Sequence, residues 1–404
     1  MKKILFLTFN YPYGHFGPSD LCSTKIMDAL VKSGKYEVHN VSYSGTEKRY
    51  ADINGVHLHM LGFPEKKRKR PNWLIRLLLL LKTPIYPYTQ PLTNKKVYSA
   101  CVPVLQKETF DLVIAQCNPE ESLRVGVWLK KNKLTNKLAV IFWDSIYGKL
   151  PRRVIPKRFA LRRQYKSENE IAKYADVLIS LYPLRSFHEE YGDVPNAIGK
   201  REYLGIPSVI RPEFRGESNY KDVIKQDKIN CLYSGTIFRR EYVTYLVELL
   251  NKTTIAERIN LIFFCRGVSE TDFEECRKSF KGTIQSSGWI PLNDLLSLYP
   301  EIDYFLSFPG NPTAICSKVY EYMSYGKPLI LLYDDDNDVN VSTFSKYPAC
   351  IALDERCAVD GNAKKIEQYI IDNTNLQIPF EEVEELFPRD TVSAYVKLID
   401  KMAL

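Results

Sequence analysis

The stretch Phe308–Ile330, FPGNPTAICSKVYEYMSYGKPLI, carries the signals that decide the fold of this chain. A strand is predicted to end at Phe308, and a loop rich in proline and glycine follows it. Ser317 is a plausible N-cap of a helix over 318–325, which ends at Gly326. A loop that opens into a helix N-terminus presents free N–H groups and the positive end of the helix dipole to an anion such as a diphosphate. We therefore expect a strand–loop–helix unit with an anion site.

Two charged side chains belong to the predicted helix. Lys318 adds a positive charge at its start, and Glu321 lies one turn further along the same face. The carboxylate of Glu321 can accept hydrogen bonds from a ribose diol. The same two residues also fit a solvated i,i+3 pair on an ordinary helix of an α/β domain. The local pattern alone leaves both interpretations open.

Apolar strands alternate with helical segments on both sides of this stretch. Strands are predicted in the first half of the chain at 3–9, 36–43, 56–60, 112–115, 139–143 and 177–181. Strands are predicted in the second half at 229–233, 260–265, 284–285, 304–308 and 329–333. Short apolar strands with helices between them are typical of parallel sheets that are covered on both faces. The pattern predicts an α/β fold with two doubly wound, Rossmann-like domains.

The polar segment Gly205–Lys228 interrupts this alternation and is typical of an interdomain linker. The predicted parts of the chain are an N-terminal domain over 1–205, a linker over 206–228, a C-terminal domain over 229–388 and a final helical segment over 389–404. Two parallel sheets joined in this way leave a cleft between the carboxyl ends of their strands.

The segment Cys316–Pro328, CSKVYEYMSYGKP, resembles the donor-site motif of GT-B glycosyltransferases, in particular family 4 members that build bacterial surface polysaccharides. The family pattern is roughly P-S-K-x-x-E-Y-x-x-x-G-x-P. The resemblance implies that Glu321 contacts the nucleotide ribose and that Ser317 belongs to the substrate site. A family glutamate that touches the donor sugar falls at Thr313 in this chain. The resemblance also implies a GT-B fold, in which a C-terminal helix crosses back onto the first domain.

A second segment, Tyr233–Arg240 with the sequence YSGTIFRR, resembles the G-R-L…K loop of the same family. It follows a strand, and Gly235 and Thr236 are expected to line the substrate site. Thr236 replaces the family arginine, so Arg239 or Arg240 would supply the positive charge. Cleavage of a sugar–phosphate bond develops negative charge on the leaving diphosphate, which positioned cations stabilise without a metal. The two arginines also fit surface residues at the start of a helix.

A third segment begins with Gly288 and Trp289 and resembles the family G-x-v motif, where backbone near the glycine meets the nucleobase. The order and spacing of the three segments agree with the family. This order is more specific than any one motif, and the resemblance covers most of residues 229–330.

Candidate site residues in the first half are fewer. Gly14, His15 and Gly17 lie in a loop after the first predicted strand, where the fold places acceptor and donor phosphates. His15 also fits an exposed loop histidine. Family members often carry a histidine after the fourth strand, but the chain reads QCNPE over 116–120. Asp144, at the carboxyl end of a strand, is the candidate acceptor contact or base, and it also fits a helix-capping residue.

Two further charged segments bear on metals and partners. The acidic run Asp334–Asp338 imitates the metal-binding D-x-D motif, but we expect a solvated loop and no metal site. The basic run Lys66–Arg70 precedes an apolar, tryptophan-led helix over Trp73–Leu81. Cations beside such a helix are typical of an interfacial membrane helix. A buried core helix beside a basic loop is the alternative. A second basic cluster, Arg152–Arg163, favours the membrane interpretation.

Composition excludes several classes of protein. The chain has 404 residues, of which 45% are hydrophobic and 26% charged, and these values exclude wholesale disorder. Residues 1–200 carry 33 basic and 17 acidic side chains, whereas 201–404 carry 23 and 31. This asymmetry argues against a uniformly basic nucleic-acid binder. Nine scattered cysteines with no CxxC pair fit a reducing cytosol.

These features predict a glycosyltransferase that moves a sugar from a nucleotide-diphosphate sugar to a glycan or lipid-linked acceptor in surface polysaccharide biosynthesis. Catalysis is expected to need no metal and no cofactor, and the resemblance favours retention at the anomeric carbon. The protein is expected to be cytoplasmic and peripheral on an anionic membrane, with no nucleic-acid partner. A nucleotide-sugar 2-epimerase and a catalytically inactive GT-B partner subunit are the alternatives.

Overall fold

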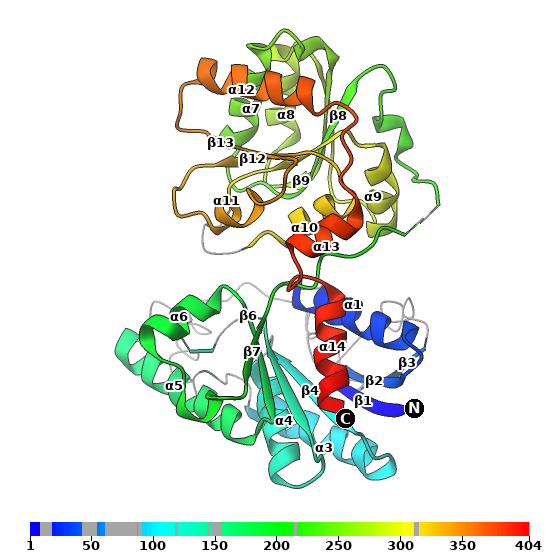
Figure 1. Cartoon of the computed structure of the whole chain (residues 1–404), viewed down its shortest axis with the longest axis vertical. Coiled ribbons are helices and arrows are strands. Elements are labelled where there is room, and N and C mark those ends of the chain that lie inside the picture. Colours follow the sequence, from blue (N-terminus) through cyan, green and yellow to red (C-terminus); the bar gives the residue numbers. More distant parts are fainter. Residues whose placement is uncertain are drawn as a thin grey trace. The chain divides into compact units, whose positions relative to one another are not determined.

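A computed structural model describes residues 1–8, 18–42, 55–60, 87, 91–117, 120–143, 146–147, 156–213, 216–310 and 315–403 (Figure 1). The chain divides into two compact units. The first unit comprises 1–207 together with 389–404, and the second comprises 208–388. Residues 208–228, predicted as a linker, therefore belong to the second unit, and the final helical segment belongs to the first.

The first unit contains a seven-stranded sheet in the order β3-β2-β1-β4-β5-β6-β7, in which every neighbouring pair is parallel. Its strands are β1 (Lys2–Leu7), β2 (Tyr36–Ser42), β3 (Val56–Met60), β4 (Leu112–Cys117), β5 (Leu138–Phe142), β6 (Val177–Leu181) and β7 (Arg201–Leu204). The chain adds strands on one side of β1 and then on the other. This reversal places a topological switch point between β1 and β4, where doubly wound sheets bind ligands.

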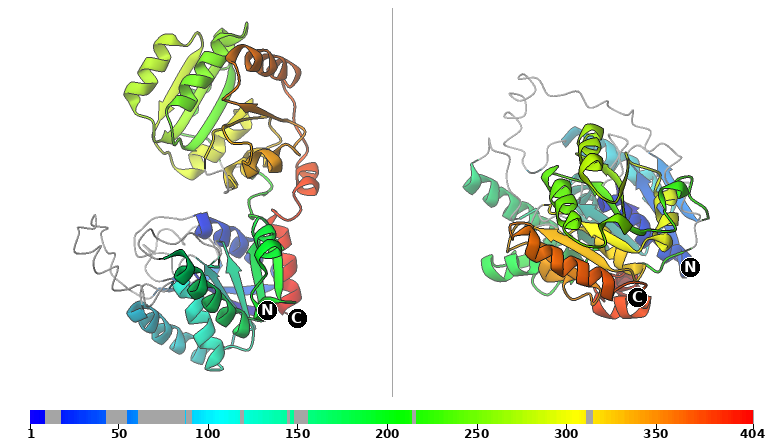
Figure 2. Two further views of the ribbon diagram at one scale, coloured as in Figure 1. Left: turned by 90° about the vertical axis from the view of Figure 1, so that its left-hand side faces the viewer. Right: turned by 90° about the horizontal axis from the view of Figure 1, so that it is seen from above.

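Helices cover both faces of this sheet (Figure 2). They are α1 (Pro18–Lys32), α3 (Pro91–Lys107), α4 (Glu120–Lys131), α5 (Lys157–Tyr174), α6 (Leu184–Tyr191) and α14 (Val392–Ala403). One apolar core contains buried residues of α1 and α14, and another contains buried residues of α3, α4 and α5. The central strands are buried on both faces, as the fully buried β4 illustrates.

The C-terminal helix α14 is part of the first core. Tyr395 and Ile399 are spaced one turn apart, so both face the sheet and are fully buried. The Tyr395 hydroxyl donates to the carbonyl oxygen of Gly205 at 2.7 Å, and its ring centroid lies 5.7 Å from that of Trp143. The helix in the predicted final segment over 389–404 therefore packs on the first unit.

The second unit contains a six-stranded parallel sheet in the order β10-β9-β8-β11-β12-β13. Its strands are β8 (Ile229–Thr236), β9 (Ile259–Arg266), β10 (Thr283–Ser287), β11 (Tyr304–Ser307), β12 (Leu329–Tyr333) and β13 (Cys350–Asp354). Its helices are α7 (Glu241–Asn251), α8 (Glu270–Ser279), α9 (Leu292–Leu298), α10 (Ser317–Ser324), α11 (Val339–Phe344), α12 (Val359–Asp372) and α13 (Phe380–Leu386). One core joins the sheet to α7, α8 and α12.

The predicted fold class is confirmed, with two corrections to its elements. The strands β7 and β13 were not predicted, and each lies at an edge of its sheet. The helix predicted over 318–325 begins at Ser317, so Cys316 and not Ser317 occupies the N-cap position. Among the described residues, no helix is long and apolar enough to cross a membrane.

Candidate functional site

The loops of interest in the second unit lie at one edge of its sheet. Strands β8, β9, β10 and β11 are parallel, so their carboxyl ends meet at the same edge. Gly235 is near the end of β8, Gly288 follows β10, and α10 begins after the loop that follows β11. The three segments that the sequence singled out are therefore brought to the edge where doubly wound sheets bind ligands.

Lys318 is the central cation of this edge. It is the second residue of α10, and its ammonium group donates to the carbonyl oxygen of Ser234 at 3.0 Å. The Lys318 Nζ also lies 3.5 Å from the Ser234 hydroxyl oxygen. Burial lowers the pKa of Lys318, although the negative charge of Glu321 acts in the opposite direction. No described carboxylate lies within ion-pair distance of Lys318, so its charge is available to an anion.

Gly235 leaves room beside this ammonium group. Its φ of +150° is one that residues with a side chain rarely adopt. A β-carbon at Gly235 would lie 3.4 Å from Lys318 Nζ and 3.0 Å from the hydroxyl of Tyr233. The absence of a side chain at Gly235 therefore keeps a β-carbon from crowding the Lys318 ammonium group and the Tyr233 hydroxyl. Thr236, the next residue, is exposed and accepts a hydrogen bond from Tyr233 at its carbonyl oxygen.

A layer of buried aromatic rings supports the cation. The ring of Tyr322 stacks on Phe305 with centroids 4.2 Å apart, and Tyr299 packs edge-on against both. The hydroxyl of Tyr322 accepts a hydrogen bond from the backbone N–H of Ser234 at 3.1 Å. These contacts fix α10 against the end of β8. They thereby set the positions of Lys318 and of Glu321, which is half-buried one turn later.

The start of α10 is held by the neighbouring helix α11. The backbone N–H of Cys316 donates to the side-chain oxygen of Asn340 at 2.7 Å. Asn340 is itself positioned by Asp338, whose carboxylate caps α11. Ser317 follows as the first helical residue, so the N-terminus of α10 is fixed by packing and hydrogen bonding. Thr313 lies outside the described residues.

The two arginines after β8 are each held by acidic side chains of the same unit. Arg239 donates to Asp334 at 3.2 Å, lies 3.7 Å from Glu355 and is about half exposed. Arg240 donates to Asp272 at 2.9 Å. Asp272 belongs to the capping box of α8. Both arginines lie near the predicted edge, but their charges are paired, whereas no described carboxylate pairs with Lys318.

Trp289 pairs with a residue that the sequence did not single out. The guanidinium of Arg266, the last residue of β9, lies 3.9 Å from the centroid of the Trp289 ring. The Trp289 side chain is 59% exposed, so the pair forms an accessible aromatic surface at the carboxyl edge. Nothing lies within 4 Å of a β-carbon placed on Gly288. A lone arginine at a strand end gives no signal in the sequence.

The acidic run Asp334–Asp338 is engaged within the protein. Asp334 accepts hydrogen bonds from Arg239 and from the Tyr242 hydroxyl. Asp336 pairs with Arg356, and Asp338 caps α11. The described carboxylates of this run thus have partners within the protein.

Several candidates in the first unit cannot be placed. Gly14, His15, Gly17 and Asp144 lie outside the described residues. The basic run Lys66–Arg70 and the helix predicted over Trp73–Leu81 do as well. These remain predictions.

Buried polar side chains do mark the carboxyl ends of strands in the first unit. Thr8 follows β1, Asn40 lies in β2 and Gln116 in β4, and all three are almost fully buried. The Thr8 hydroxyl donates to Asn40 at 3.0 Å, and the indole N–H of Trp143 donates to Gln116 at 3.0 Å. Gln116 therefore holds Trp143, the residue before Asp144.

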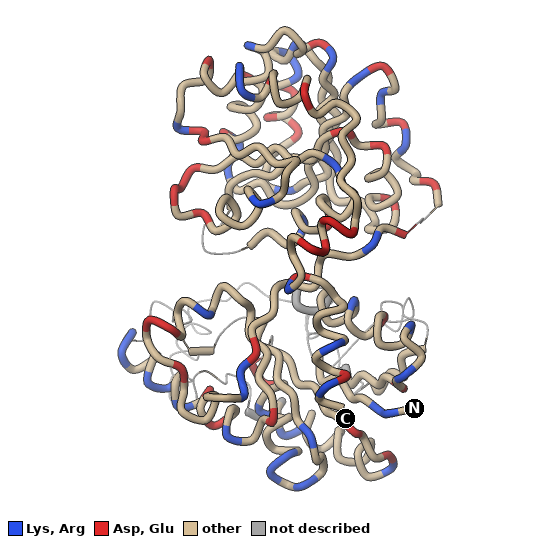
Figure 3. Tube along the Cα trace, viewed as in Figure 1, with Lys and Arg blue, Asp and Glu red and all other residues tan. Residues whose placement is uncertain are grey.

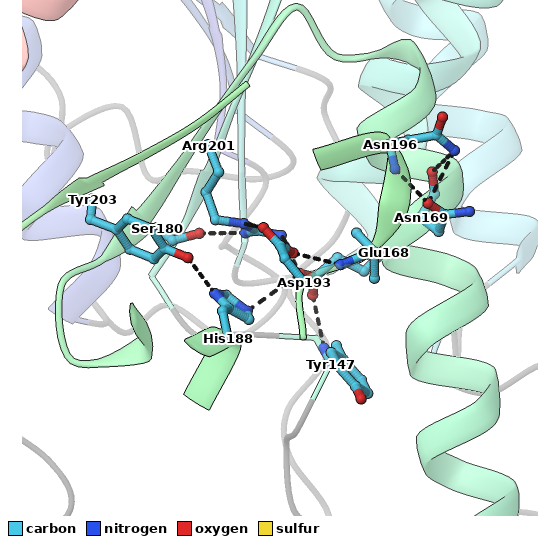
Figure 4. A network of polar contacts seen from close by, with 10 residues as sticks. Tyr147, Glu168, Asn169, Ser180, His188, Asp193, Asn196, Arg201 and Tyr203 are labelled. Carbon is cyan, nitrogen blue, oxygen red and sulfur yellow. Dashed lines mark hydrogen bonds and ion pairs between the residues drawn. The ribbon is translucent and has the colours of Figure 1, made fainter. Parts of the chain in front are cut away.

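A charged network lies beside β6 and β7 (Figure 4). The guanidinium of Arg201 binds both carboxylate oxygens of Asp193, at 2.6 and 2.8 Å, and one oxygen of Glu168 at 2.7 Å. The other oxygen of Glu168 accepts a hydrogen bond from the backbone N–H of Tyr147 at 2.8 Å. The network thus fixes the backbone three residues after Asp144.

His188 completes this network. Its Nδ1 lies 2.8 Å from the Tyr203 hydroxyl, and its Nε2 lies 4.0 Å from a Glu168 oxygen. The side chain is only 2% exposed. Burial, followed by the positive charge of Arg201, lowers the pKa of His188 to about 4. The imidazole is therefore neutral at neutral pH, in contrast to the charged groups around it.

Comparison with known proteins identifies the fold. A scan against protein-family models finds no match, and a search of curated proteins finds no significant relative. Solved structures do match over the whole chain. Sucrose-phosphate synthase from Thermosynechococcus elongatus has a TM-score of 0.60 at 15% identity, over 99% of this chain and 98% of that one. HepE from Anabaena, solved with UDP and glucose, has a TM-score of 0.60 at 12% identity, over 99% of both chains.

WaaG, a glycosyltransferase involved in lipopolysaccharide biosynthesis, matches at a TM-score of 0.54 and 14% identity, over 95% of this chain and 99% of that one. The chain has the GT-B fold. In this GT-B chain the structure brings Gly235, Ser317, Lys318 and Glu321 to one edge of the second sheet. Ser234 and Arg266 lie at the same edge and were not predicted from the sequence.

Proposed function

We propose that this GT-B chain is a glycosyltransferase that moves a sugar from a nucleotide-diphosphate sugar donor. The observation that carries the proposal is Lys318, which has no described carboxylate partner and is held at the N-terminus of α10 beside Gly235, where no side chain crowds its ammonium group. A diphosphate needs such a combination of a cation, free N–H groups and room for close approach. The fold supports the proposal, since HepE, of the same fold, was solved with UDP-glucose.

The residues of the second unit would perform separate tasks. Lys318 and the start of α10 at Ser317 would stabilise the charge that develops on the leaving diphosphate. Arg239 and Arg240 would assist if the donor displaces their acidic partners. Glu321 would bind the ribose hydroxyls, and Trp289 with Gly288 would contact the base. Because fixed cations supply the stabilisation, the proposed transfer needs no metal and no cofactor.

The acceptor is proposed to be a glycan or lipid-linked saccharide of surface polysaccharide biosynthesis, bound mainly by the first unit. Asp144 would contact the acceptor hydroxyl, with Gly14, His15 and Gly17 nearby, and Thr313 would lie near the donor sugar. The resemblance to family 4 favours retention at the anomeric carbon. Proton NMR of a product from a defined donor reads the anomeric configuration directly, and an inverted product would contradict this part.

The first unit is also proposed to bind an anionic membrane at the cytoplasmic face. Helix α5 supports this, because basic residues recur along it (Figure 3). Its exposed surface combines cations with aromatic side chains, namely Lys157, Arg158, Phe159, Arg162, Tyr165 and Lys166. Cations beside exposed aromatic rings suit an interface with anionic lipid. Sedimentation with phosphatidylglycerol vesicles should fall with added salt, and binding that ignores lipid charge and salt would contradict it.

Release of the nucleoside diphosphate tests the central proposal. Wild-type protein is incubated with a panel of nucleotide sugars and a lipid or glycan extract, beside a Glu321→Ala variant and a Lys364→Met control on the exposed face of α12. We expect release by wild type and by the control and at least a tenfold loss in Glu321→Ala. Nucleotide binding with no turnover on any donor would instead indicate an inactive partner subunit. Interconversion of free donor epimers would indicate an epimerase.

A further inference from the structure

Three of the five histidines of the chain meet at the edge of the first sheet, in a cluster with Glu37 and Glu108 that the proposed function does not use. The cluster is built by strand periodicity. Glu37 and His39 are two residues apart on β2, and His57 and His59 are two residues apart on the edge strand β3. Alternate residues of a strand share a face. Because His39 lies opposite His57 in the parallel register, all four side chains lie on one face.

The metal-ligating atoms of this cluster converge on one point. The Nε2 atom of His39 lies 2.9 Å from Oε1 of Glu37, and Nε2 of His57 lies 3.9 Å from the same oxygen. These three atoms all lie within 4.8 Å of one another. Ligands about 2.0–2.2 Å from a tetrahedral zinc ion are about 3.3 Å apart, so the observed separations need only small side-chain shifts to surround an ion.

The surroundings of His39 suit a metal ligand. His39 is 3% exposed, and its ring lies close to those of His57 and His59, with centroids 4.6 and 5.2 Å away. Its second nitrogen, Nδ1, lies 2.9 Å from Nε2 of His59. A metal-binding histidine usually donates its other ring N–H to a fixed acceptor, which orients the ring. His59 Nε2 is the atom placed to accept such a hydrogen bond from His39.

We propose that Glu37, His39 and His57 form a zinc-binding site, with water or Glu108 as the fourth ligand. Imidazole and carboxylate are ligands of Zn²⁺, and three protein ligands with one open position are a known zinc arrangement. His57 is 59% exposed, which gives an ion access from solvent. Glu108 Oε2 lies 3.7 Å from His39 Nε2, within reach of the same ion.

The site lies away from the proposed transfer chemistry. Glu37 and His57 are the second residues of β2 and β3, and His39 is in the middle of β2, so the three proposed ligands lie toward the amino ends of these strands. The loops that bind substrate in this fold follow the carboxyl ends. A bound ion would join β2 to the edge strand β3, and its role would be to stabilise the first unit and not to catalyse transfer.

Lys3 offers a test that separates a metal site from an ion-pair cluster. Its ammonium group lies 3.2 Å from Glu37 Oε1 and 2.8 Å from Glu108 Oε2, so it competes with an ion for the same carboxylates. A Lys3→Met variant removes this competitor and leaves the ligands in place. A zinc site should then bind Zn²⁺ more tightly, and added Zn²⁺ should restore the stability that the variant loses. A cluster with no metal role would lose stability with or without Zn²⁺.

The experiment uses the full chain without an affinity tag, stripped with EDTA and titrated with Zn²⁺ by calorimetry and thermal unfolding. We expect one Zn²⁺ per chain and, at a hundredfold excess over Kd, a rise of about a hundredfold in the folded-to-unfolded ratio. His57→Gln should abolish binding, and His59→Gln should weaken it about 10–100-fold. Asp28→Asn, an exposed carboxylate on α1, is the matched control that should bind as wild type.

Cobalt provides a second readout that does not depend on stability. Co²⁺ in a tetrahedral nitrogen and oxygen site gives visible absorption bands, which we expect in wild type and in Asp28→Asn but not in His57→Gln. The proposal is overturned if wild type takes up no stoichiometric Zn²⁺, or if His57→Gln and Glu37→Gln bind Zn²⁺ as wild type does.

Discussion

Arg201 in the first unit and Lys318 in the second are both cations withdrawn from solvent, but their partners differ. Arg201 is enclosed by Asp193 and Glu168, and its hydrogen bonds to them raise its pKa despite the opposing effect of burial. Lys318 contacts the carbonyl oxygen of Ser234, and burial lowers its pKa. A cation that is paired with carboxylates of its own protein stabilises the fold. A cation that contacts only neutral groups of its own protein, as Lys318 does among the described residues, can bind an anionic ligand.

The largest effect is expected for Arg201, the cation whose charge is paired with carboxylates. Arg201→Met leaves Asp193 and Glu168 buried without their partner, and loss of one member of such a buried pair costs about 3–5 kcal/mol. Urea denaturation should show this loss in unfolding free energy. The control, Arg185→Met, breaks an exposed pair with Glu189 and should cost less than about 1 kcal/mol. Equal losses in the two variants would contradict the structural role of Arg201.

The second prediction concerns Lys318, the cation that has no described carboxylate partner. Lys318→Ala removes the charge that would stabilise the leaving diphosphate, and we expect kcat to fall about 10²–10³-fold, as for the loss of one group that stabilises transition-state charge. Stability should change little, because Lys318 has no described ion-pair partner to leave unpaired. Steady-state kinetics and thermal unfolding measure the two quantities. A variant that loses stability but retains full kcat would reverse the assignment.

The third prediction concerns pH and the first unit. The folded state holds His188 neutral until about pH 4, whereas an unfolded histidine takes up a proton near pH 6.5. The unfolded state therefore binds more protons below pH 6.5, so stability falls as the pH drops from 6.5 toward 4. The full loss is at most about 3 kcal/mol. Urea denaturation of wild type and His188→Asn at several pH values should show a weaker pH dependence in the variant. Identical slopes would count against a buried neutral His188.

The smallest expected effect is on nucleotide affinity and concerns Trp289, the proposed contact to the nucleobase. Trp289→Ala should weaken nucleotide binding about tenfold, since stacking of a base on an aromatic ring contributes about 1–3 kcal/mol. Calorimetric titration with nucleoside diphosphates measures this loss. Tyr191→Ala removes an exposed aromatic side chain from the first unit and should leave the affinity unchanged. An unchanged affinity in Trp289→Ala would remove this residue from the nucleotide site.

The alternation of apolar strands was sufficient to predict both sheets except for one edge strand in each, β7 and β13. The missed strand β7, REYL, contains two charged residues and looks like a loop in the sequence. In the structure Arg201 of β7 pairs with Glu168 on α5, 33 positions away, and with Asp193 before η3 (Pro195–Ala197), 8 positions away. These partners allow a charged residue to lie in a strand. Local patterns contain no information on such distant partners.

The candidate site also contains residues that local sequence patterns could not identify. Lys318 and Glu321 were found through a motif within one helix, where sequence spacing is equivalent to spatial spacing. Arg266 was missed, because its meeting with Trp289 depends on the register of two strands. The histidine cluster was readable in principle, since E-x-H and H-x-H in strands place their side chains on one face. The predicted residues of the first unit, Asp144 included, stay predictions.

The most direct test of the central claim is the affinity of nucleoside diphosphates for wild type, Lys318→Met and the exposed control Lys364→Met. We expect one diphosphate to bind wild type and the Lys364→Met control equally, and to bind Lys318→Met at least tenfold more weakly. We also expect the matching nucleoside without phosphates to bind the three proteins with similar affinity. Equal diphosphate affinity in Lys318→Met and wild type would contradict the claim that Lys318 binds the donor diphosphate.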